Sequence, residues 1–493
     1  MKVLLINTPI NRQDILGSFS PIYDDLKMVP TGIAYLAAVL KNAGIEVRIL
    51  DQYAECLSMD SIYALIRSFA PDLIGYSSTT PNFYAAIDMV RHIRKKFPDT
   101  PTVMGGMHPT IFPNEVLSDK AVDFVIRDEG EYSLLSLCEA ISDNKKKFAH
   151  IPGLSYKDVS GQIHNKPSES VALDALPYPA YDLLPMHLYS SPSYTKFSSP
   201  VYQMIASRGC PFSCAYCINA ELNISAKYRR RDLNSVIDEM KMLVDKYGAK
   251  QIQFWDPIFP LGKEHALEFC RRVIASGLHK KISWNSTTRP DFITDEVAEL
   301  MVKSGCKAIG FGIESGVPAL LKSVNKNLDL EKVRQVCKIA AKHGLVTFSG
   351  FIIGFPNETK LMTQQTIDFA KELDLHYAQF SILVPYPGTP LYRELEKNGE
   401  IAPSNEKDYV RYNQSVGLTD EDPIYVPKGR NASEIKRMQR KAYIEFYLRP
   451  KMLIMHLPHL RFQKIMGMFR SLIAILNLLA VNLKEQLKMP EKL

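Results

Sequence analysis

Ser207-Arg-Gly-Cys-Pro-Phe-Ser-Cys-Ala-Tyr-Cys-Ile-Asn219 is the stretch from which the rest of the chain can be interpreted. Its three cysteines, Cys210, Cys214 and Cys217, follow the spacing C-x3-C-x2-C. Thiolates are the usual ligands of iron–sulfur clusters, and three of them leave one iron of a four-iron cluster without a protein ligand. An open position of this kind is what catalytic metal sites keep for a substrate. Because the apolar residues 201–206 come directly before it, the stretch predicts an open cluster in a loop that follows a strand.

Two simpler interpretations compete with an iron–sulfur cluster. The stretch could be a zinc site that lacks its fourth ligand, or a group of thiols clustered in a core. A structural zinc site needs a fourth Cys or His at matching spacing, and none lies near residues 207–219. The spacing also differs from both ferredoxin patterns. The open cluster is therefore the favoured interpretation.

The composition is that of a globular protein with more than one domain. At 493 residues, with 46% hydrophobic and 23% charged residues, the chain is expected to form two or three domains. The net charge of +7 is modest, and we expect no nucleic-acid partner. The beginning, Met1-Lys-Val-Leu-Leu-Ile, reads as a first strand and not as a signal peptide. Five further cysteines are scattered singly, which indicates a reducing compartment and a cytoplasmic protein: Cys56, Cys138, Cys270, Cys306 and Cys337.

Residues 1–140 alternate short apolar strands with helices. The apolar runs 3–6 and 73–76 are separated by segments such as 31–43, which has helical periodicity. This order predicts parallel βαβ units and a doubly wound, Rossmann-like α/β domain. Ligands of such domains bind beyond the carboxyl ends of the strands. The polar residues and glycines of the loops there are candidates for a ligand site, although ordinary turns select the same residue types: Thr8, Ser78, Thr79, Thr80, Gly105, Gly106 and His108.

The rest of the chain divides into three parts. Residues 141–195 are rich in Lys, Ser, Pro and Tyr and are predicted to be a linker. Residues 196–400 contain six strand-like runs with helices between them, which predicts a partial (β/α)6 barrel of the TIM type. Chemistry in such barrels takes place at the C-terminal ends of the strands, where the cysteine loop belongs. Residues 401–493 are predicted to be mainly helical.

The C-terminal region is basic and partly apolar. Residues 436–441 carry four basic side chains on a predicted helix, and residues 471–483 form an apolar run between Arg470 and Lys484. That run is shorter than the roughly 20 apolar residues that span a bilayer. The region could associate with an anionic membrane surface or cap the barrel, and we favour the cap.

The cysteine spacing, with Tyr216 before the third cysteine, resembles the signature of the radical S-adenosylmethionine (SAM) superfamily. Residues 1–140 resemble the cobalamin (B12)-binding domain that precedes this signature in one large subgroup. That subgroup contains class B methyltransferases and the anaerobic magnesium-protoporphyrin monomethyl ester cyclase. The resemblance extends over most of residues 1–392, and these segments carry it: 30–40, 105–110, 128–131, 254–259, 312–316, 350–356 and 385–392.

The resemblance implies a [4Fe-4S] cluster, SAM and cobalamin as cofactors. The three thiolates would hold the cluster, and SAM would chelate the fourth iron. A reductant such as flavodoxin or ferredoxin would supply the electron that cleaves SAM into methionine and a 5′-deoxyadenosyl radical. For Arg289 and Glu314 the simpler alternatives are a surface ion pair and a helix-start residue. The resemblance implies these SAM-binding residues: Tyr216, Trp255, Asp256, Arg289, Glu314, Ser315 and Gly354.

The implied cobalamin site departs from the D-x-H-x-x-G pattern of many cobalamin domains. His108 stands in Gly-Met-His-Pro-Thr, without the matching Asp and Gly. Since members of the resembling subgroup often bind cobalamin without a protein histidine on cobalt, we interpret His108 as a loop residue near the corrin and not as a cobalt ligand. Glu129 and Gly130, in the matching segment 128–131, complete the implied cobalamin-binding set. Retention of the fold without cobalamin is the alternative.

Three functions fit these features. The first is a cobalamin-dependent methyltransferase that acts on an unactivated carbon of a small molecule, such as a lipid or a tetrapyrrole, with possible peripheral membrane contact through the C-terminal region. The second is a cyclase or oxidative enzyme of the magnesium-protoporphyrin type, which would share both domains. The third is a corrinoid or metal carrier without catalysis. The sequence identifies neither the substrate nor the oligomeric state.

Overall fold

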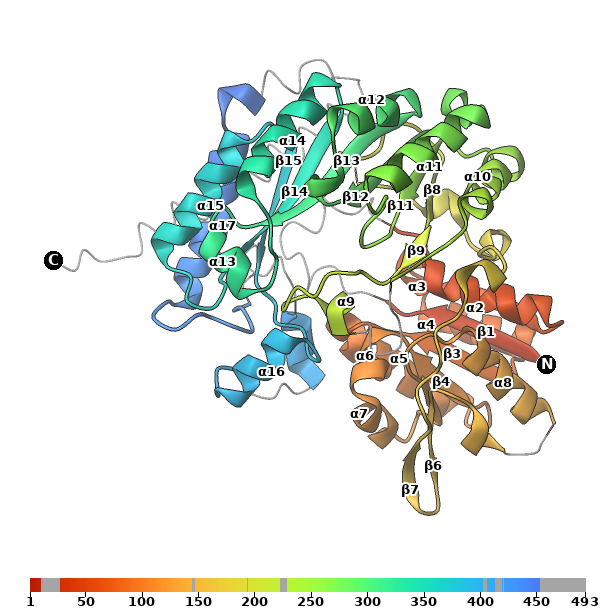
Figure 1. The fold of residues 1–493 in the computed structure, drawn as a ribbon. Helices are drawn as coiled ribbons and strands as arrows, with labels where there is room; N and C mark the ends of the chain where they lie inside the picture. Colours follow the sequence, from red (N-terminus) through yellow and green to blue (C-terminus); the bar gives the residue numbers. More distant parts are fainter. Residues whose placement is uncertain are drawn as a thin grey trace.

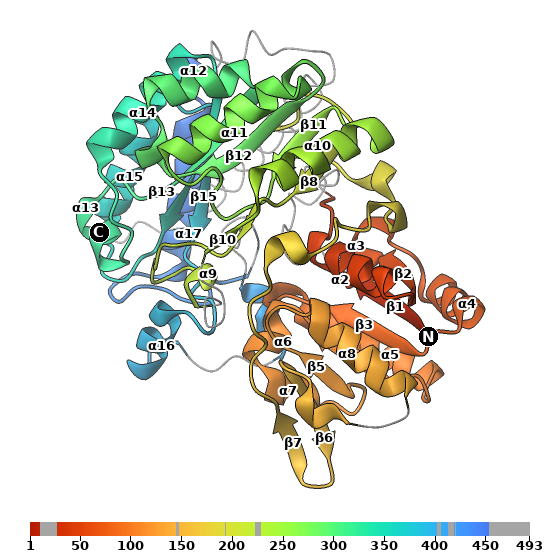
Figure 2. The same cartoon turned by 45° about the vertical axis from the view of Figure 1, so that its right-hand side comes forward.

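The chain folds into an N-terminal α/β domain, a partial barrel and a C-terminal segment that contacts both (Figures 1 and 2). The structure is a computed structural model, and it describes residues 1–9, 27–143, 147–192, 194–221, 228–401, 406–412, 419 and 421–452. Across these ranges, every helix is too short or too polar to span a bilayer. The apolar run at 471–483 lies outside the described residues, so its predicted role stays a prediction.

A seven-stranded sheet forms the N-terminal domain, in the order β2-β1-β3-β4-β5-β6-β7. Strands β1 to β5 are parallel, which confirms the predicted doubly wound arrangement. In β1, Leu4 and Ile6 pack into one hydrophobic cluster while Val3 and Leu5 pack into another, because helices cover both faces. The strands are β1 Lys2–Asn7, β2 Glu46–Asp51, β3 Leu73–Ser77, β4 Thr102–Gly105, β5 Phe124–Ile126, β6 Leu154–Asp158 and β7 Gly161–His164. The helices are α2 Thr31–Asn42, α3 Gln52–Glu55, α4 Met59–Phe69, α5 Phe83–Lys96, α6 Met107–Ile111, α7 Pro113–Ser118 and α8 Glu131–Ser142.

The hairpin of β6 and β7 lies within the segment that the sequence predicts to be a linker. It pairs with β5 in antiparallel fashion and projects from the domain in both views (Figures 1 and 2). Leu154 and Tyr156 are buried against the domain, whereas β7 is largely exposed. Four- and five-residue strands with so many polar side chains give only a weak alternation pattern, which explains why the sequence does not reveal them.

Six parallel strands form the barrel sheet, in the order β8-β11-β12-β13-β14-β15. The order confirms the predicted partial barrel, in which each strand lies beside the next and a helix connects them. The strands are β8 Val201–Met204, β11 Gln251–Phe254, β12 Ser283–Thr288, β13 Cys306–Glu314, β14 Val346–Ile353 and β15 Tyr377–Ile382. The helices are α10 Leu233–Tyr247, α11 Lys263–Ala275, α12 Asp295–Lys303, α13 Pro318–Ser323, α14 Leu330–Lys342, α15 Lys360–Glu372 and α16 Pro390–Lys397.

The segment that connects the two domains is seated on the barrel by polar side chains. The carbonyl oxygen of Thr195 accepts hydrogen bonds from the side-chain amides of Gln251 (2.6 Å) and Asn285 (3.0 Å), which belong to β11 and β12. On the other side, the Tyr189 hydroxyl donates to the buried carboxylate of Asp51 at 2.7 Å. The connection is therefore bonded to both domains and fixes one against the other.

Helix α17 (Ala432–Tyr447) covers the outer edge of the barrel sheet and contains the predicted basic helix at 436–441. The Tyr447 hydroxyl bonds both the N–H (3.1 Å) and the carbonyl (2.9 Å) of Ala378 in β15. The Tyr443 hydroxyl accepts from the N–H of Phe380 at 3.2 Å. These bonds satisfy backbone groups that an edge strand leaves unpaired.

Candidate active site

The cysteine loop lies between β9 (Ser207–Arg208) and α9 (Ile218–Glu221), at the junction of the barrel and the N-terminal domain (Figures 1 and 2). The N–H of Ala215 donates to the carbonyl of Val324 at 2.9 Å, and the Asn325 side chain donates to the Ser213 hydroxyl at 2.7 Å. The carbonyl of Ala215 accepts from the N–H of Leu391 at 3.0 Å. The loop is thus held by segments that follow β13 and β15, at the C-terminal face of the barrel.

The three predicted cluster ligands lie close enough to influence one another electrostatically. Cys214 is buried, and Cys210 and Cys217 are partly buried. Burial raises the pKa of both Cys210 and Cys217, the neighbouring thiols raise it further, and the ammonium group of Lys326 lowers it. Lys326, which the sequence did not single out, therefore favours the thiolate forms that a metal cluster needs.

The three cysteines of the loop are ligands of the kind that iron–sulfur clusters use. A four-iron cluster places each thiolate on a different iron, so its ligands do not need to converge on one point. The donor set and its surroundings therefore fit a [4Fe-4S] cluster held by Cys210, Cys214 and Cys217.

Glu314 and Tyr216, two of the predicted SAM-binding residues, lie together beside the cysteine loop. Glu314 ends β13 with a φ of 71° and forms an ion pair with Lys326 at 3.1 Å, and both side chains are largely buried. Burial raises the pKa of Tyr216, and the nearby Glu314 carboxylate raises it further. Tyr216 also packs edge-on against Phe355, with ring centroids 5.8 Å apart. A carboxylate, an ammonium group and a phenol thus meet next to the cluster ligands.

Arg289 forms an ion pair, which was the simpler alternative to a role in SAM binding, and it also contacts the cysteine loop. It bonds Asp291 at 2.6 Å and the carbonyl of Asn327 at 2.8 Å. Its guanidinium carbon lies 4.1 Å from the ring centre of Phe212, between the first two cluster cysteines. The contact of Arg289 with the SAM carboxylate, which the resemblance implies, remains a prediction.

Asp256 anchors the start of the cysteine loop. Its carboxylate accepts from the N–H of Ala206 at 3.1 Å and from the Ser207 hydroxyl, so it joins the end of β11 to the segment before Cys210. Burial raises the pKa of Asp256 to about 7, although these hydrogen bonds oppose the rise. The adjacent Trp255 is 40% exposed, which leaves its indole accessible at this face.

Ser315 and Gly354 make mainly structural contacts. The buried Ser315 hydroxyl lies 3.0 Å from that of Thr366 and accepts from the N–H of Val317 at 3.1 Å. Gly354, with a φ of +97°, donates its N–H to the Glu358 carboxylate. Both residues shape the loops after β13 and β14, and their proposed contacts with SAM stay predictions.

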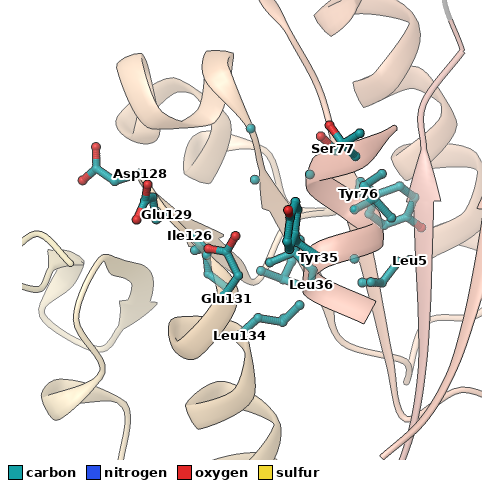
Figure 3. Close-up of a pocket in the computed structure, with 18 of the residues that line it drawn as sticks. Leu5, Tyr35, Leu36, Tyr76, Ser77, Ile126, Asp128, Glu129, Glu131 and Leu134 are labelled. Carbon is teal, nitrogen blue, oxygen red and sulfur yellow. The ribbon is translucent and has the colours of Figure 1, made fainter. Parts of the chain in front are cut away.

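A cavity of about 360 Å³ opens in the N-terminal domain between the carboxyl ends of the strands and the starts of α2 and α8 (Figure 3). Of the predicted cobalamin-binding residues, Gly105, Gly106, Glu129 and Gly130 line it. Gly106 needs the absence of a side chain, because a Cβ there would lie 2.6 Å from the Ser78 carbonyl oxygen. Other lining residues were not named as site residues from the sequence, although Tyr35, Leu36 and Glu131 lie in segments that carry the resemblance: Leu5, Tyr35, Leu36, Tyr76, Ser77, Ile126, Glu131, Leu134 and Arg208.

The cavity combines apolar walls with buried polar atoms that have no partner in the described part of the chain. These atoms are the hydroxyl of Tyr76 and the Oε2 atom of Glu131. In Figure 3, Glu131 and Tyr35 project toward the space between α2 and α8, and Asp128 points away from it. Since buried polar atoms are normally hydrogen-bonded, the cavity suits a ligand that offers polar groups as well as apolar surface. A corrinoid has both, because carboxamide side chains surround its macrocycle.

Thr8 and Thr79 belong to a hydrogen-bonded network beside the cavity. The Thr8 hydroxyl donates to the Ser77 carbonyl at 2.6 Å and accepts from the Asn82 side chain at 3.0 Å. Asn82 in turn accepts from the N–H of Thr79 at 2.7 Å. Ser78 and Thr80 are buried in the same loop. These four predicted residues support the loop after β3 and are not among the cavity-lining residues.

His108 differs from the prediction of a loop residue, because it lies on the short helix α6. It is fully buried and stacks on Phe83 with ring centroids 3.8 Å apart, and it contacts Tyr409 edge-on at 4.6 Å. Burial lowers its pKa to about 3, and neither ring nitrogen has a partner within the described ranges. One of the aromatic residues around His108, Tyr409, lies far along the chain. The sequence near His108 therefore did not predict that the side chain is buried among aromatic rings.

An ionic contact joins the cavity to the cysteine loop. Arg208, two residues before Cys210, bonds Glu131 at 2.6 Å and Glu129 at 3.3 Å. Arg229, on β10 (Arg229–Arg230), also pairs with Glu129. The segment 128–131, which the sequence associated with cobalamin, therefore binds the strand that leads into the cluster site.

Comparison with known proteins agrees with this architecture. Residues 25–137 match the B12 binding domain and residues 204–370 match the radical SAM superfamily. Over 459 residues the chain is 35% identical to an uncharacterised methyltransferase of Pyrococcus horikoshii, with 92% of this chain and 94% of the relative covered. The chain belongs to the B12-binding radical SAM superfamily.

Two further comparisons extend this family assignment. The chain is 27% identical to the anaerobic magnesium-protoporphyrin IX monomethyl ester cyclase of Cereibacter sphaeroides, with 87% of this chain and 68% of the relative covered. Its fold matches the radical SAM methyltransferase TsrM of Kitasatospora setae, solved with cobalamin and a [4Fe-4S] cluster bound, with a TM-score of 0.67, 19% identity and coverage of 91% and 89%. The two family matches confirm the predicted cofactors, a [4Fe-4S] cluster, SAM and cobalamin.

Proposed function

We propose that this enzyme is a methyltransferase that transfers a methyl group from SAM, through cobalamin, to an unactivated carbon of a small molecule. The observation that carries the proposal is the position of Arg208. This residue lines the cavity, bonds Glu131 there and leads directly into the cysteine loop, so the two proposed cofactor sites are adjacent. The name of the Pyrococcus relative supports the same reaction class. When bound, the cluster and SAM supply a radical, and the corrinoid supplies the methyl group.

The residues of the chain would position these groups. Cys210, Cys214 and Cys217 would hold the cluster, and Lys326 would favour their thiolate forms. We propose that Glu314 and Arg289 bind polar groups of SAM, since both lie beside the cysteine loop. The junction between the domains would keep water away from the radical, because closed sites prevent side reactions of reactive intermediates.

The test uses the full-length protein with a reconstituted cluster and bound hydroxocobalamin, under anaerobic conditions with dithionite. It is incubated with SAM labelled by deuterium in the methyl group and with a small-molecule extract of the source cells. We expect S-adenosylhomocysteine and 5′-deoxyadenosine in equal amounts. One SAM would give up its methyl group, and another would be cleaved reductively to methionine and a 5′-deoxyadenosyl radical that takes a hydrogen atom from the substrate. A product that carries three deuterium atoms would identify the substrate.

A cyclase or oxidative reaction is the second candidate, supported by the similarity to the protoporphyrin ester cyclase. It would give 5′-deoxyadenosine without stoichiometric S-adenosylhomocysteine, and no deuterium would enter the product. This outcome would overturn the methyltransferase proposal. If SAM is not cleaved at all after reduction, the chain is a corrinoid carrier. Flavodoxin or ferredoxin remains the proposed reductant, and a lipid or a tetrapyrrole the proposed substrate class.

A further inference from the structure

We propose that the Glu131 carboxylate binds the corrinoid with one oxygen and the cysteine loop with the other, so that occupancy of the cavity is transmitted to the cluster site. The inference rests on the proposed corrinoid site in the N-terminal cavity. It gives Glu131 a contact with the cofactor, and it makes Arg208 a positioning residue for the cluster loop.

The two oxygens of Glu131 have different surroundings. Glu131 is the first residue of α8, is 4% exposed and lines the cavity. Its Oε1 atom accepts from the Nη2 atom of Arg208 at 2.6 Å. Its Oε2 atom is buried and has no hydrogen-bond partner in the part of the chain that the structure describes. Because buried carboxylate oxygens are normally hydrogen-bonded, a donor on the ligand is expected here. The carboxamide side chains of a corrinoid are donors of this kind.

The guanidinium group of Arg208 contacts side chains of the N-terminal domain, although Arg208 follows the first strand of the barrel. Its guanidinium group bonds Glu131 and Glu129, and its central carbon lies 5.1 Å from the ring centre of Tyr35, which also lines the cavity. In the antiparallel ribbon of β9 and β10, the backbone of Arg208 lies directly opposite that of Arg229, so the two cationic side chains are neighbours. Glu129 lies between these two cations and offsets their repulsion.

This arrangement makes the position of the cysteine loop depend on the cavity. Only Gly209 separates Arg208 from Cys210. A ligand that draws the Glu131 carboxylate toward the cavity also draws the guanidinium group of Arg208, which is bonded to it. Because a guanidinium group is planar and its hydrogen bonds are directional, a shift of the carboxylate reorients the arginine side chain. The carboxylate is therefore a short connection between the corrinoid and the first cluster ligand.

The test measures hydroxocobalamin binding and loop exchange separately. Full-length protein with a reconstituted cluster is titrated with hydroxocobalamin by absorbance, and hydrogen exchange of residues 207–217 is followed by mass spectrometry. Glu131→Gln removes the negative charge and replaces one of the two acceptor oxygens by a donor, at nearly the same size. We therefore expect about tenfold weaker binding, the loss typical of a charged hydrogen bond. Arg208→Gln, compared with the wild type at saturating hydroxocobalamin, should lose the slowing of loop exchange that hydroxocobalamin causes in the wild type. Arg208→Lys should restore part of that slowing.

The matched control is Arg230→Gln, since Arg230 is an exposed neighbour of Arg229 on the same ribbon. It should behave as wild type in both measurements. Unchanged binding in Glu131→Gln, or loop exchange in the wild type that does not respond to hydroxocobalamin, would overturn the inference. If the wild-type protein takes up no hydroxocobalamin, both the proposed corrinoid site and this inference are wrong. Normal uptake without methyl transfer would overturn only the proposed function.

Discussion

At the scale of single residues, Asp256 shows how burial and hydrogen bonding compete at the start of the cysteine loop. The buried carboxylate accepts three hydrogen bonds from Ala206 and Ser207, yet the loss of hydration raises its pKa to about 7. The folded chain therefore keeps a proton on Asp256 at pH values where the unfolded chain has lost it. Between about pH 4 and pH 7 this difference makes stability fall as the pH rises, and above pH 7 the contribution is constant.

We expect Asp256→Asn to remove this pH dependence. From pH 6 to pH 8, the wild type should lose about 1.4 kcal/mol more of its free energy of unfolding than the variant, because titration through a folded pKa of about 7 over this range is equivalent to one pKa unit. Denaturant titrations of both proteins at the two pH values measure the difference, and other titrating groups cancel in the comparison. Equal slopes with pH for the two proteins would mean that Asp256 is ionised throughout this range.

At the scale of elements, helix α17 replaces a neighbouring strand at the edge of the barrel sheet. Its side chains bond backbone groups of β15 that would otherwise be buried without partners. Gln439 is fully buried and donates to the carbonyl of Phe380 at 2.6 Å. The helix thus contributes polar bonds as well as the apolar contacts of Ile435, Met438 and Phe446.

We expect Tyr447→Phe to destabilise the protein by about 1–2 kcal/mol, because it removes two hydrogen bonds to Ala378 while it keeps the ring. Hydrogen exchange of residues 377–382 should become faster, and the denaturant midpoint should fall. Tyr132→Phe is the matched control, since Tyr132 is 43% exposed on α8. If the two variants have the same stability, α17 does not hold the edge through its hydroxyl groups.

The elements that the sequence predicted well are those with strong periodicity. Buried parallel strands and amphipathic helices repeat in a fixed order, so both sheets could be expected before the structure was known. The position of Thr195 on the barrel could not be expected in this way, because it depends on hydrogen bonds from the polar side chains of Gln251 and Asn285. Tyr35 and Tyr76 read as ordinary core residues of a helix and a strand, and only the fold shows that they line a cavity.

At the scale of the whole molecule, the two cofactor sites are adjacent but are built by different parts of the chain. The cysteines were predictable because three soft ligands lie within eight residues, whereas the contact of Arg208 with Glu131 joins positions 77 residues apart. Apart from Ile205 and Arg208, all cavity-lining residues lie between positions 5 and 134. The cavity should therefore form without the cluster.

This separation predicts the behaviour of a variant in which Cys210, Cys214 and Cys217 are all replaced by Ala. It should lose the brown absorbance and the iron of the cluster. It should still bind hydroxocobalamin with an affinity within about tenfold of wild type, because the lining residues of the cavity are unchanged and Arg208 contributes at most one charged hydrogen bond. Iron analysis and absorbance titration measure the two properties on one sample. Cys337→Ala, at a buried cysteine of α14, is the control and should keep both cofactors. Loss of iron and corrinoid together in the triple variant, with both kept in the control, would show that the cobalamin site depends on the cluster loop and is not a property of the N-terminal domain.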